Sequence, residues 1–416
     1  MIKKNKILVL GIGQSNFLNQ LYENLIIENP SLAIDIDGYR DISKGKNLSS
    51  DFEYDNYFDL KKVRIKKIDL FKKIIQLLFG SFFWKIVFFE LTQELTFKKF
   101  IELIKEYSRA KHIAENYIQP KNYQIFHFHF CTPRNLKYLY FLPENTKSIC
   151  SFWGSDLLRA TGSSNVFYVQ LALQKATVIT VQTRELAEIL FCKYGRDFTE
   201  KTQYLPFTIS TKIYDSIDKY KLNYNKIEEF KIKYKIPLDK KVIVISHNAF
   251  RENNHIKVLQ ELRNLPDSVK KEITLVLPLT YGQDQEYINE LNAILIEDIK
   301  IVLILDYFDS DEIALLRLAT DIMIQMPLSD ALSGTMTEVL YAGNKVIAGS
   351  WLPYGLLRRN GIVFSEIDNF SDLTTTIEKL LNSIEINDNQ GIIKSLLFPD
   401  TTTPLWNNLF KNLLDD

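Results

Sequence analysis

Short apolar runs alternate with amphipathic segments along most of this chain. The run at 6–12 (KILVLGI) predicts a buried strand, and residues 16–29 place apolar side chains at helical spacing. A second strand is predicted at 32–36. The same alternation returns in β-rich runs at 124–130, 148–153 and 177–183, with a helical pattern at 184–195 after the last of them.

The alternation restarts after a charged stretch, rich in Tyr and Lys, at about 213–238. Predicted strands and helices then follow in the order 241–248, 253–265, 272–279, 285–295, 299–305, 311–319, 321–326, 335–342 and 345–350. Continuous apolar strands separated by helices are typical of parallel sheets that are covered on both faces. We therefore predict two doubly wound α/β domains, residues 1–212 and 213–400, which face each other across a cleft. Ligands are expected beyond the carboxyl ends of the strands.

One insertion, residues 61–91, breaks the alternation. Seven basic residues precede Ile74, and a cluster of aromatic and aliphatic side chains that includes Phe82, Phe83 and Trp84 follows. The longest uncharged run, from Ile74 to Trp84, is 11 residues and too short to cross a bilayer. A basic surface with exposed aromatic residues suits the headgroups of an anionic membrane. The alternative is a pair of core helices with a solvated lysine face.

The charge balance and the cysteine content limit which partners and which compartment are expected. The 416 residues carry 51 basic and 51 acidic side chains, so no overall charge attracts nucleic acid. The separated cysteines Cys131, Cys150 and Cys192 fit neither a disulfide framework nor a zinc site. They indicate a reducing compartment. We expect a cytoplasmic protein without a nucleic-acid partner.

The glycines after the first strand raise a dinucleotide-binding alternative. Gly11 and Gly13 form a G-x-G turn, and Asp35 and Asp37 end the second strand near the place of a ribose-binding acid. Asn16 stands where the third glycine of that motif belongs, so the following helix could not pack as closely on the sheet. We favour a tight turn that places Gly13 beside the cleft, on the acceptor side.

The stretch 329–350 (SDALSGTMTEVLYAGNKVIAGS) carries the most specific pattern. Asp330 and Glu338 are eight residues apart and flank Ser333, Gly334 and Thr335 at the start of a predicted helix. Such a helix start presents backbone N–H groups to an anion. The two carboxylates can accept hydrogen bonds from sugar hydroxyls, so the pattern predicts a site for a nucleotide-diphospho-sugar. The alternative is that Asp330 caps the helix and Glu338 is a surface acid.

This stretch resembles the acid-x7-acid signature of the retaining GT-B glycosyltransferases of the large family-four group, with Asp330 in place of their first glutamate. The segments 246–256 (SHNAFRENNHI) and 277–288 (LPLTYGQDQEYI) resemble more closely the bacterial 4-acetamido-4,6-dideoxygalactose transferases. The segments FHFHF and SFWGSDLLR resemble strand ends of transferases that build surface polysaccharides. The resemblance spans about residues 120–350.

The resemblance implies a GT-B fold whose last helix, residues 401–416, crosses back to the N-terminal domain. It implies that Arg251 and Lys257 bind the donor pyrophosphate, which makes them catalytic candidates. It also implies that Tyr307 and Phe308 lie at the nucleobase and that catalysis needs neither a metal nor another cofactor. The remaining assignments put Asp330 at the donor sugar as a catalytic residue, Glu338 at the ribose, and Ser333, Gly334 and Thr335 at the phosphates.

Other polar residues at predicted strand ends complete the candidate set. His129 and Trp153 are assigned to the acceptor side of the cleft, although His129 also fits a structural role. Trp153 stands where the family often has a histidine. Asp156 is a candidate general base or a helix cap. His247 ends a strand, where it could approach the donor phosphates or serve the fold.

These features predict a glycosyltransferase that moves a hexosyl or amino sugar from a nucleotide-diphospho-sugar to a growing bacterial surface glycan, such as a capsule, O-antigen or lipopolysaccharide chain. We expect a polyprenyl-linked acceptor and a peripheral position at the inner face of the cytoplasmic membrane. Two alternatives stay open. One is a nucleotide-sugar 2-epimerase of the same fold, and the other is a non-catalytic sugar- or membrane-binding partner in a polysaccharide assembly complex.

Overall fold

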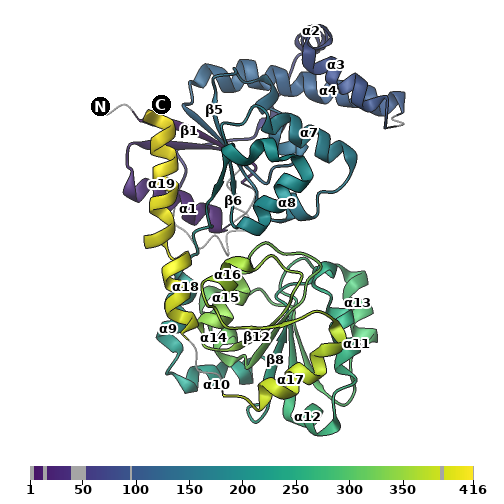
Figure 1. The fold of residues 1–416 in the computed structure, drawn as a ribbon, viewed down its shortest axis with the longest axis vertical. Coiled ribbons are helices and arrows are strands. Elements are labelled where there is room, and N and C mark those ends of the chain that lie inside the picture. Colours follow the sequence, from purple (N-terminus) through teal and green to yellow (C-terminus); the bar gives the residue numbers. More distant parts are fainter. Residues whose placement is uncertain (1–3, 13–15, 39–52, 94–95, 385–387, 416) are drawn as a thin grey trace. The chain divides into compact units, whose positions relative to one another are not determined.

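The structure, a computed structural model, describes residues 4–12, 16–38, 53–93, 96–384 and 388–415. The chain divides into two compact units, residues 1–208 with 402–416 and residues 209–401. Each unit contains one parallel sheet with helices packed on it (Figure 1). The predicted α/β class with two parallel, doubly wound sheets is confirmed.

The sheet of the first unit has the strand order β3-β2-β1-β4-β5-β6-β7. Its strands are β1 (Asn5–Leu10), β2 (Leu32–Asp37), β3 (Asn56–Phe58), β4 (Ile125–His129), β5 (Lys147–Ser151), β6 (Val178–Val181) and β7 (Thr202–Tyr204). Its α-helices are α1 (Asn16–Glu28), α2 (Lys67–Leu78), α3 (Ser81–Glu90), α4 (Phe97–Ile113), α5 (Pro133–Leu136), α6 (Ser155–Leu158), α7 (Ser163–Leu173) and α8 (Arg184–Tyr194). All described strand pairs are parallel, and Val9 of β1 pairs with Ile36 of β2 and with His127 of β4.

The last helix, α19 (Pro399–Asp415), belongs to the core of the first unit from residue 402 onward. Trp406, Leu409, Phe410 and Leu413 pack in one cluster with Ile7 and its neighbours from β1 and α1. These four positions follow helical spacing, so they form one apolar stripe. The Trp406 indole N–H donates to the Pro206 carbonyl at 2.9 Å. Helix α19 thus completes the hydrophobic core that β1 and α1 begin.

The sheet of the second unit has the strand order β10-β9-β8-β11-β12-β13. Its strands are β8 (Lys241–Ile245), β9 (Ile273–Pro278), β10 (Lys300–Ile304), β11 (Ile322–Gln325), β12 (Lys345–Gly349) and β13 (Ser365–Ile367). Its α-helices are α9 (Thr211–Tyr220), α10 (Tyr224–Lys233), α11 (His255–Leu262), α12 (Asp267–Glu272), α13 (Gln285–Ala293), α14 (Ser310–Ala319), α15 (Gly334–Tyr341), α16 (Gly355–Arg359), α17 (Leu373–Leu381) and α18 (Asn389–Leu397).

Both faces of this second sheet are buried, which explains why its strands are apolar throughout. Ile243 and Ile245 of β8 join a core with α11, α13 and α17. Val242 and Val244 point to the other face and join a core with α10 and α14. Because side chains alternate along a strand, each strand needs apolar residues at every position when helices cover both faces.

Candidate functional site

A cavity of about 160 Å³ lies at the carboxyl ends of the strands of the second unit. The loops after β8, β9 and β10 and the helices α14 and α15 supply its walls. Its lining residues are His247, Pro278, Thr280, Tyr281, Tyr307, Phe308, Ile313, Leu316, Arg317, Thr335 and Glu338. The chain leaves β8 on one side toward β9 and β10 and returns on the other side to β11. This is the switch point at which open α/β sheets bind ligands.

A buried ion pair forms one wall of this cavity. The Nε of Arg317 on α14 donates to Oε2 of Glu338 on α15 at 2.9 Å, and the two side chains are 7% and 12% exposed. Burial raises the pKa of Glu338, and the Arg317 charge opposes that rise. Arg317 thus holds the Glu338 carboxylate in a fixed orientation at the cavity wall, with much of its water removed.

The start of α15 presents backbone donors beside this pair. Ser333 is the N-cap, and its Oγ accepts from the Met336 N–H at 3.1 Å. A Cβ added to Gly334 would meet no atom within 4 Å, so the helix start borders open space. Thr335 lines the cavity one residue later. The first N–H groups of a helix lack partners within the helix, and together with its dipole they favour an anion.

Asp330 takes a different position from the one expected at the donor sugar. Its Oδ2 accepts from the Tyr354 hydroxyl at 2.7 Å and from Gln325 Nε2 at 3.3 Å, and its Oδ1 accepts from the Ala331 N–H. Tyr354 and Gln325 are fully buried. Asp330 is not among the residues that line the cavity. Its carboxylate therefore holds the loop between β11 and α15 to the body of the unit.

The two cations assigned to the pyrophosphate also lie outside the cavity wall. Arg251 makes two hydrogen bonds of 2.7 Å to Glu290 of α13, and its guanidinium lies 4.7 Å from the Tyr287 ring centroid. Lys257 is exposed on the outer side of α11, with its Nζ 5.6 Å from the Phe370 ring centroid. The apolar stripe of α11 faces the sheet, which turns Lys257 away from it.

In the first unit, His129 is fully buried and lies in a chain of hydrogen bonds. Its Nδ1 accepts from the Trp153 indole N–H at 2.9 Å, so its Nε2 carries the proton that is donated to the Tyr22 hydroxyl at 2.5 Å. Tyr22 then donates to Nδ1 of His127 at 2.7 Å, and His127 Nε2 donates to Ser151 at 2.7 Å. This chain corrects the assignment of His129 to a surface that binds the acceptor: His129 serves the core.

Asp156 is also enclosed, at 3% exposure. Its Oδ1 accepts from the N–H groups of Trp153 and Gly154, and its Oδ2 accepts from the Cys131 N–H at 2.8 Å. Burial raises its pKa, and these hydrogen bonds oppose the rise. Asp156 joins the loops after β4 and β5, which is the structural alternative to a general base.

The glycine turn after β1 has a packing explanation. Gly11 has a φ of 78°, and an added Cβ would lie 2.3 Å from the His129 carbonyl oxygen. Only glycine fits so close to the neighbouring backbone. Gly13 lies outside the described residues.

Buried histidines make the stability of the protein sensitive to mild acid. Burial lowers the pKa of His127 to about 3 and that of His255 to about 4, and it lowers the pKa of His129 well below its usual range. Below pH 6.5 the unfolded chain binds protons that the folded chain does not, so stability falls as the pH falls. Between pH 7.5 and 5.5 we expect these histidines to lower the stability by about 1.4 kcal/mol each, so by about 3 kcal/mol in the first unit (His127 and His129) and about 1.4 kcal/mol in the second unit (His255). Urea unfolding at the two pH values measures it, and equal stability at both would show that these histidines titrate normally.

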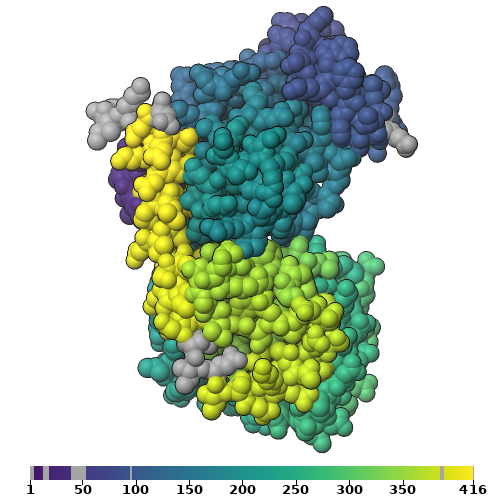
Figure 2. Space-filling view, in the orientation of Figure 1, coloured from purple at the N-terminus to yellow at the C-terminus, as the bar shows by residue number. Residues whose placement is uncertain are grey.

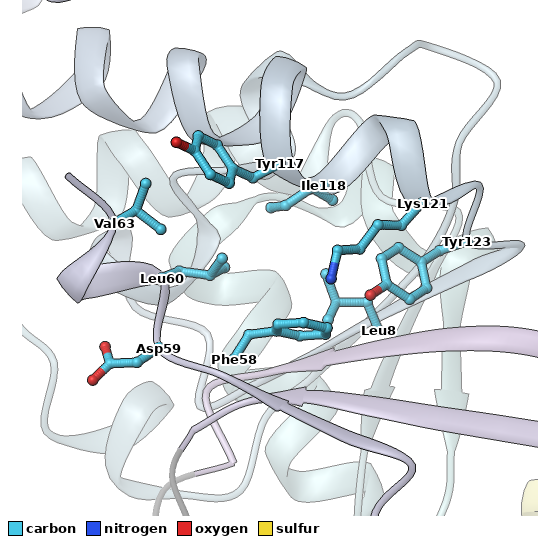
Figure 3. A pocket seen from close by; sticks show the side chains of 9 residues that line it. All are labelled: Leu8, Phe58, Asp59, Leu60, Val63, Tyr117, Ile118, Lys121 and Tyr123. Atoms are coloured by element: carbon cyan, nitrogen blue, oxygen red, sulfur yellow. The ribbon is translucent and has the colours of Figure 1, made fainter. Parts of the chain in front are cut away.

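A second cavity, of about 100 Å³, lies in the first unit between the sheet and the segment that follows β3 (Figure 3). Its walls are mostly apolar, with Leu8, Leu60 and Ile118 buried and the Lys121 amine 3.1 Å from the Phe58 ring centroid. It contains none of the predicted site residues. Its small volume and apolar walls suit a nucleotide-sugar less well than the cavity beside Glu338.

Sequence reasoning therefore named five residues that the structure brings together in one cavity, and it missed Arg317. Those five are His247, Tyr307, Phe308, Thr335 and Glu338. The signal for Arg317 was its place in the apolar run LLRLA, because an arginine in a buried stripe needs a partner. Among the described residues, no group of three or more His, Cys, Asp and Glu side chains is placed to hold a metal ion.

Comparison with solved structures identifies the fold. A glycosyltransferase from Rickettsia africae superposes with a TM-score of 0.68 at 15% identity, over 99% of each chain. The fold is GT-B. Sucrose-phosphate synthase from Thermosynechococcus elongatus matches with a TM-score of 0.66 at 11% identity, over 99% of this chain and 100% of that one. The Anabaena protein HepE, solved with UDP and glucose, matches with a TM-score of 0.65 at 12% identity, over 98% and 99%. No protein-family model and no curated protein sequence matches the chain.

Proposed function

We propose that this GT-B protein transfers a sugar from a nucleotide-diphospho-sugar to an acceptor hydroxyl. The observation that carries the proposal is the Glu338–Arg317 pair beside the open helix start at Gly334. The helix start suits the diphosphate, and the oriented carboxylate suits sugar hydroxyls one turn away. Tyr307, half-exposed at the rim, offers a face for the nucleobase. Solved neighbours of the same fold were crystallised with UDP or UDP-glucose, which supports this class of donor.

Negative charge develops on the departing phosphate in this reaction. The groups that donate hydrogen bonds to that phosphate therefore contribute most to the rate. The proposal assigns this role to the start of α15 and to His247, with Arg251 as an outer cation. Arg251 stays in the proposal because its neighbour Phe250 packs against the cavity residue Tyr281, with ring centroids 5.9 Å apart. Lys257 leaves the proposal because it faces away. Asp156 is not the general base, because its carboxylate accepts three backbone N–H groups.

The resemblance to surface-polysaccharide transferases suggests the acceptor. In this proposal a hexosyl or amino sugar is added to a lipid-linked bacterial surface glycan, at the inner face of the cytoplasmic membrane, without a metal. The 2-epimerase alternative is less well supported. It would need several acids at the sugar, and the described lining of the cavity contains only Glu338.

Nucleoside diphosphates test the donor site directly. At about 100 times its Kd, the correct one should stabilise the protein by about 2.7 kcal/mol, which corresponds to a rise in Tm of about 5–10 °C. UDP, dTDP and GDP would be compared, and membrane extracts with matching donors would then be searched for glycosylated products by mass spectrometry. Stabilisation by none of them would contradict the proposal. Epimerisation of the donor alone, seen by NMR, would favour the 2-epimerase.

A pair of lysine and arginine variants tests the diphosphate assignment. Arg251→Ala should lower kcat/KM by about 10²-fold or more, because a charge-assisted contact to the leaving group is lost. Lys257→Ala is the matched control on the same loop-helix segment and should change the rate less than about twofold, as exposed surface substitutions do. Equal effects of the two variants would remove Arg251 from the site.

A further inference from the structure

The three helices α2, α3 and α4 form a projection of the first unit (Figures 1 and 2). Helix α2 carries two apolar stripes. Leu70, Ile74 and Leu77 are at helical spacing and turn inward, with Leu77 fully buried. Ile68 and Phe71 begin a second stripe on the outward side. A helix of a globular unit normally shows one such stripe, so the outward stripe of α2 lacks a partner among the described residues.

The end of α2 and the neighbouring helices also expose large apolar side chains. Phe79 is 86% exposed, Phe97 is 78% exposed and Phe88 is 67% exposed. The complete set, which we call the outer face, is Ile68, Phe71, Ile75, Leu78, Phe79, Trp84, Phe88, Leu91, Phe97 and Ile101. Monomeric proteins rarely expose so many large apolar side chains on one small structure unless the surface binds something.

The projection is held firmly to the rest of its unit. Phe82 of α3 packs against Tyr140 with ring centroids 4.5 Å apart, and Phe89 stacks on Phe167 at 4.0 Å. Lys73 of α2 pairs with Glu115, which also accepts from Lys111. The aromatic residues Phe82 and Phe83, expected at a membrane, thus pack inward. The outward side chains are presented by a packed structure and are not the result of a missing core.

Positive charge accompanies the outer face. Exposed basic residues on and beside the three helices are Lys66, Lys67, Lys72, Lys85, Lys98, Lys99 and Lys105. Acidic groups are fewer: Asp69 is half-buried, Glu90 is buried and accepts from Tyr168, Glu106 pairs with Lys137, and Glu102 is exposed. An apolar face with basic neighbours matches an anionic lipid bilayer, whose headgroups are negative and whose interior is apolar.

The geometry points to the outer face as a docking surface for an anionic bilayer. Its helices lie in the interfacial layer, about 5–10 Å deep, with their lysines among the phosphates. Within the described residues no helix is long and apolar enough to span the membrane. A second copy of the chain is a poorer occupant, because a twofold interface would bring the lysines of both copies together. The inference rests on the proposed function only in placing the acceptor at the same membrane.

Vesicle binding by the full chain tests this surface. We expect strong binding to phosphatidylcholine vesicles that contain phosphatidylglycerol, and weak binding without it. The double variant Phe71→Ser/Phe79→Ser should bind about 100-fold more weakly, since each buried phenylalanine contributes about tenfold or more. The matched control Leu222→Ser/Ile232→Ser removes side chains that are 83% and 64% exposed in the second unit, and it should bind normally.

Two further measurements separate the contribution of the lysine charges from the depth at which the helices lie in the bilayer. Lys66→Gln/Lys67→Gln/Lys72→Gln should bind about 100-fold more weakly at about 0.01 M salt and like the parent protein at about 1 M. Lys73 is excluded from this variant because its ion pair with Glu115 joins α2 to the rest of the unit. Trp84, half-exposed, should shift its emission to shorter wavelength on binding and be quenched by brominated lipid, and Trp84→Phe should lose both signals.

Three results would overturn the inference. These are no binding to anionic vesicles at low salt, equal loss in the control variant, or a dimer without lipid that the phenylalanine variant dissociates. Stabilisation by nucleoside diphosphates is measured without vesicles, so a failure of this surface and a failure of the donor site are distinguishable.

Discussion

Replacing Glu338 by glutamine is expected to weaken binding of the nucleoside diphosphate by about 10–150-fold. A hydrogen bond to a charged group contributes about 1.5–3 kcal/mol, and glutamine loses the charge while its side-chain oxygen can still accept from Arg317. The fold should therefore survive the change better than the binding does. Calorimetric titration measures the affinity, and urea unfolding of the same variant measures the stability.

Two further variants separate binding from folding. Glu366 forms an exposed ion pair with Arg358 in the same unit, so Glu366→Gln is the matched control and should leave nucleotide affinity unchanged. Arg317→Met leaves the Glu338 carboxylate buried without its partner and should cost about 3–5 kcal/mol of stability. If Glu338→Gln binds the nucleoside diphosphate normally, the pair serves only the fold.

Replacing Trp406 by alanine should destabilise the first unit by about 3–5 kcal/mol, although it lies close to the end of the chain. Trp406 is fully buried, packs in one cluster with residues of β1 and α1, and donates to the Pro206 carbonyl. The substitution opens a large cavity and leaves that carbonyl without its donor. Urea unfolding followed by circular dichroism gives the change in stability.

The neighbouring residue supplies the control. Leu405 is 41% exposed on the same helix, and Leu405→Ala should cost less than about 1 kcal/mol. Added nucleoside diphosphate should shift only the transition of the second unit, which separates the two units in one experiment. Equal losses for both variants would mean that α19 does not contribute to the core of the first unit.

The carboxyl ends of the strands were predictable, and most of the cavity residues lie there. His247 follows β8 and was named from its place after an apolar run, whereas Tyr307, which follows β10, was named from the resemblance to GT-B transferases. Parallel strands bring their carboxyl ends to one edge, so residues far apart in sequence meet there. Thr335 and Glu338 follow from the helix start in the same way. His247, Thr335 and Glu338 needed only the pattern of strands and helices.

The surroundings of other assigned residues depended on partners that no local pattern reveals. Arg251 faces Glu290, which lies 39 residues later on another helix. His129 faces Tyr22 and Trp153, which come from two other elements, and so it is buried instead of exposed. In residues 61–91 the apolar content was evident, but the two sides of each helix were not. Phe79 is exposed, whereas Phe83 is buried beside Phe100 of α4.

The alternation of strands and helices, the two parallel sheets and the polar residues at their carboxyl ends could be predicted from the amino-acid sequence. These follow from the spacing of apolar side chains, which is a local property. Which charges are paired and which apolar faces are covered became clear only in the folded chain. It joined Arg317 to Glu338 across two helices, brought Trp406 into the core of β1 and α1, and left Phe71 and Phe79 without a cover. Pairing and burial depend on side chains from distant parts of the chain, so they appear only when the fold brings those parts together.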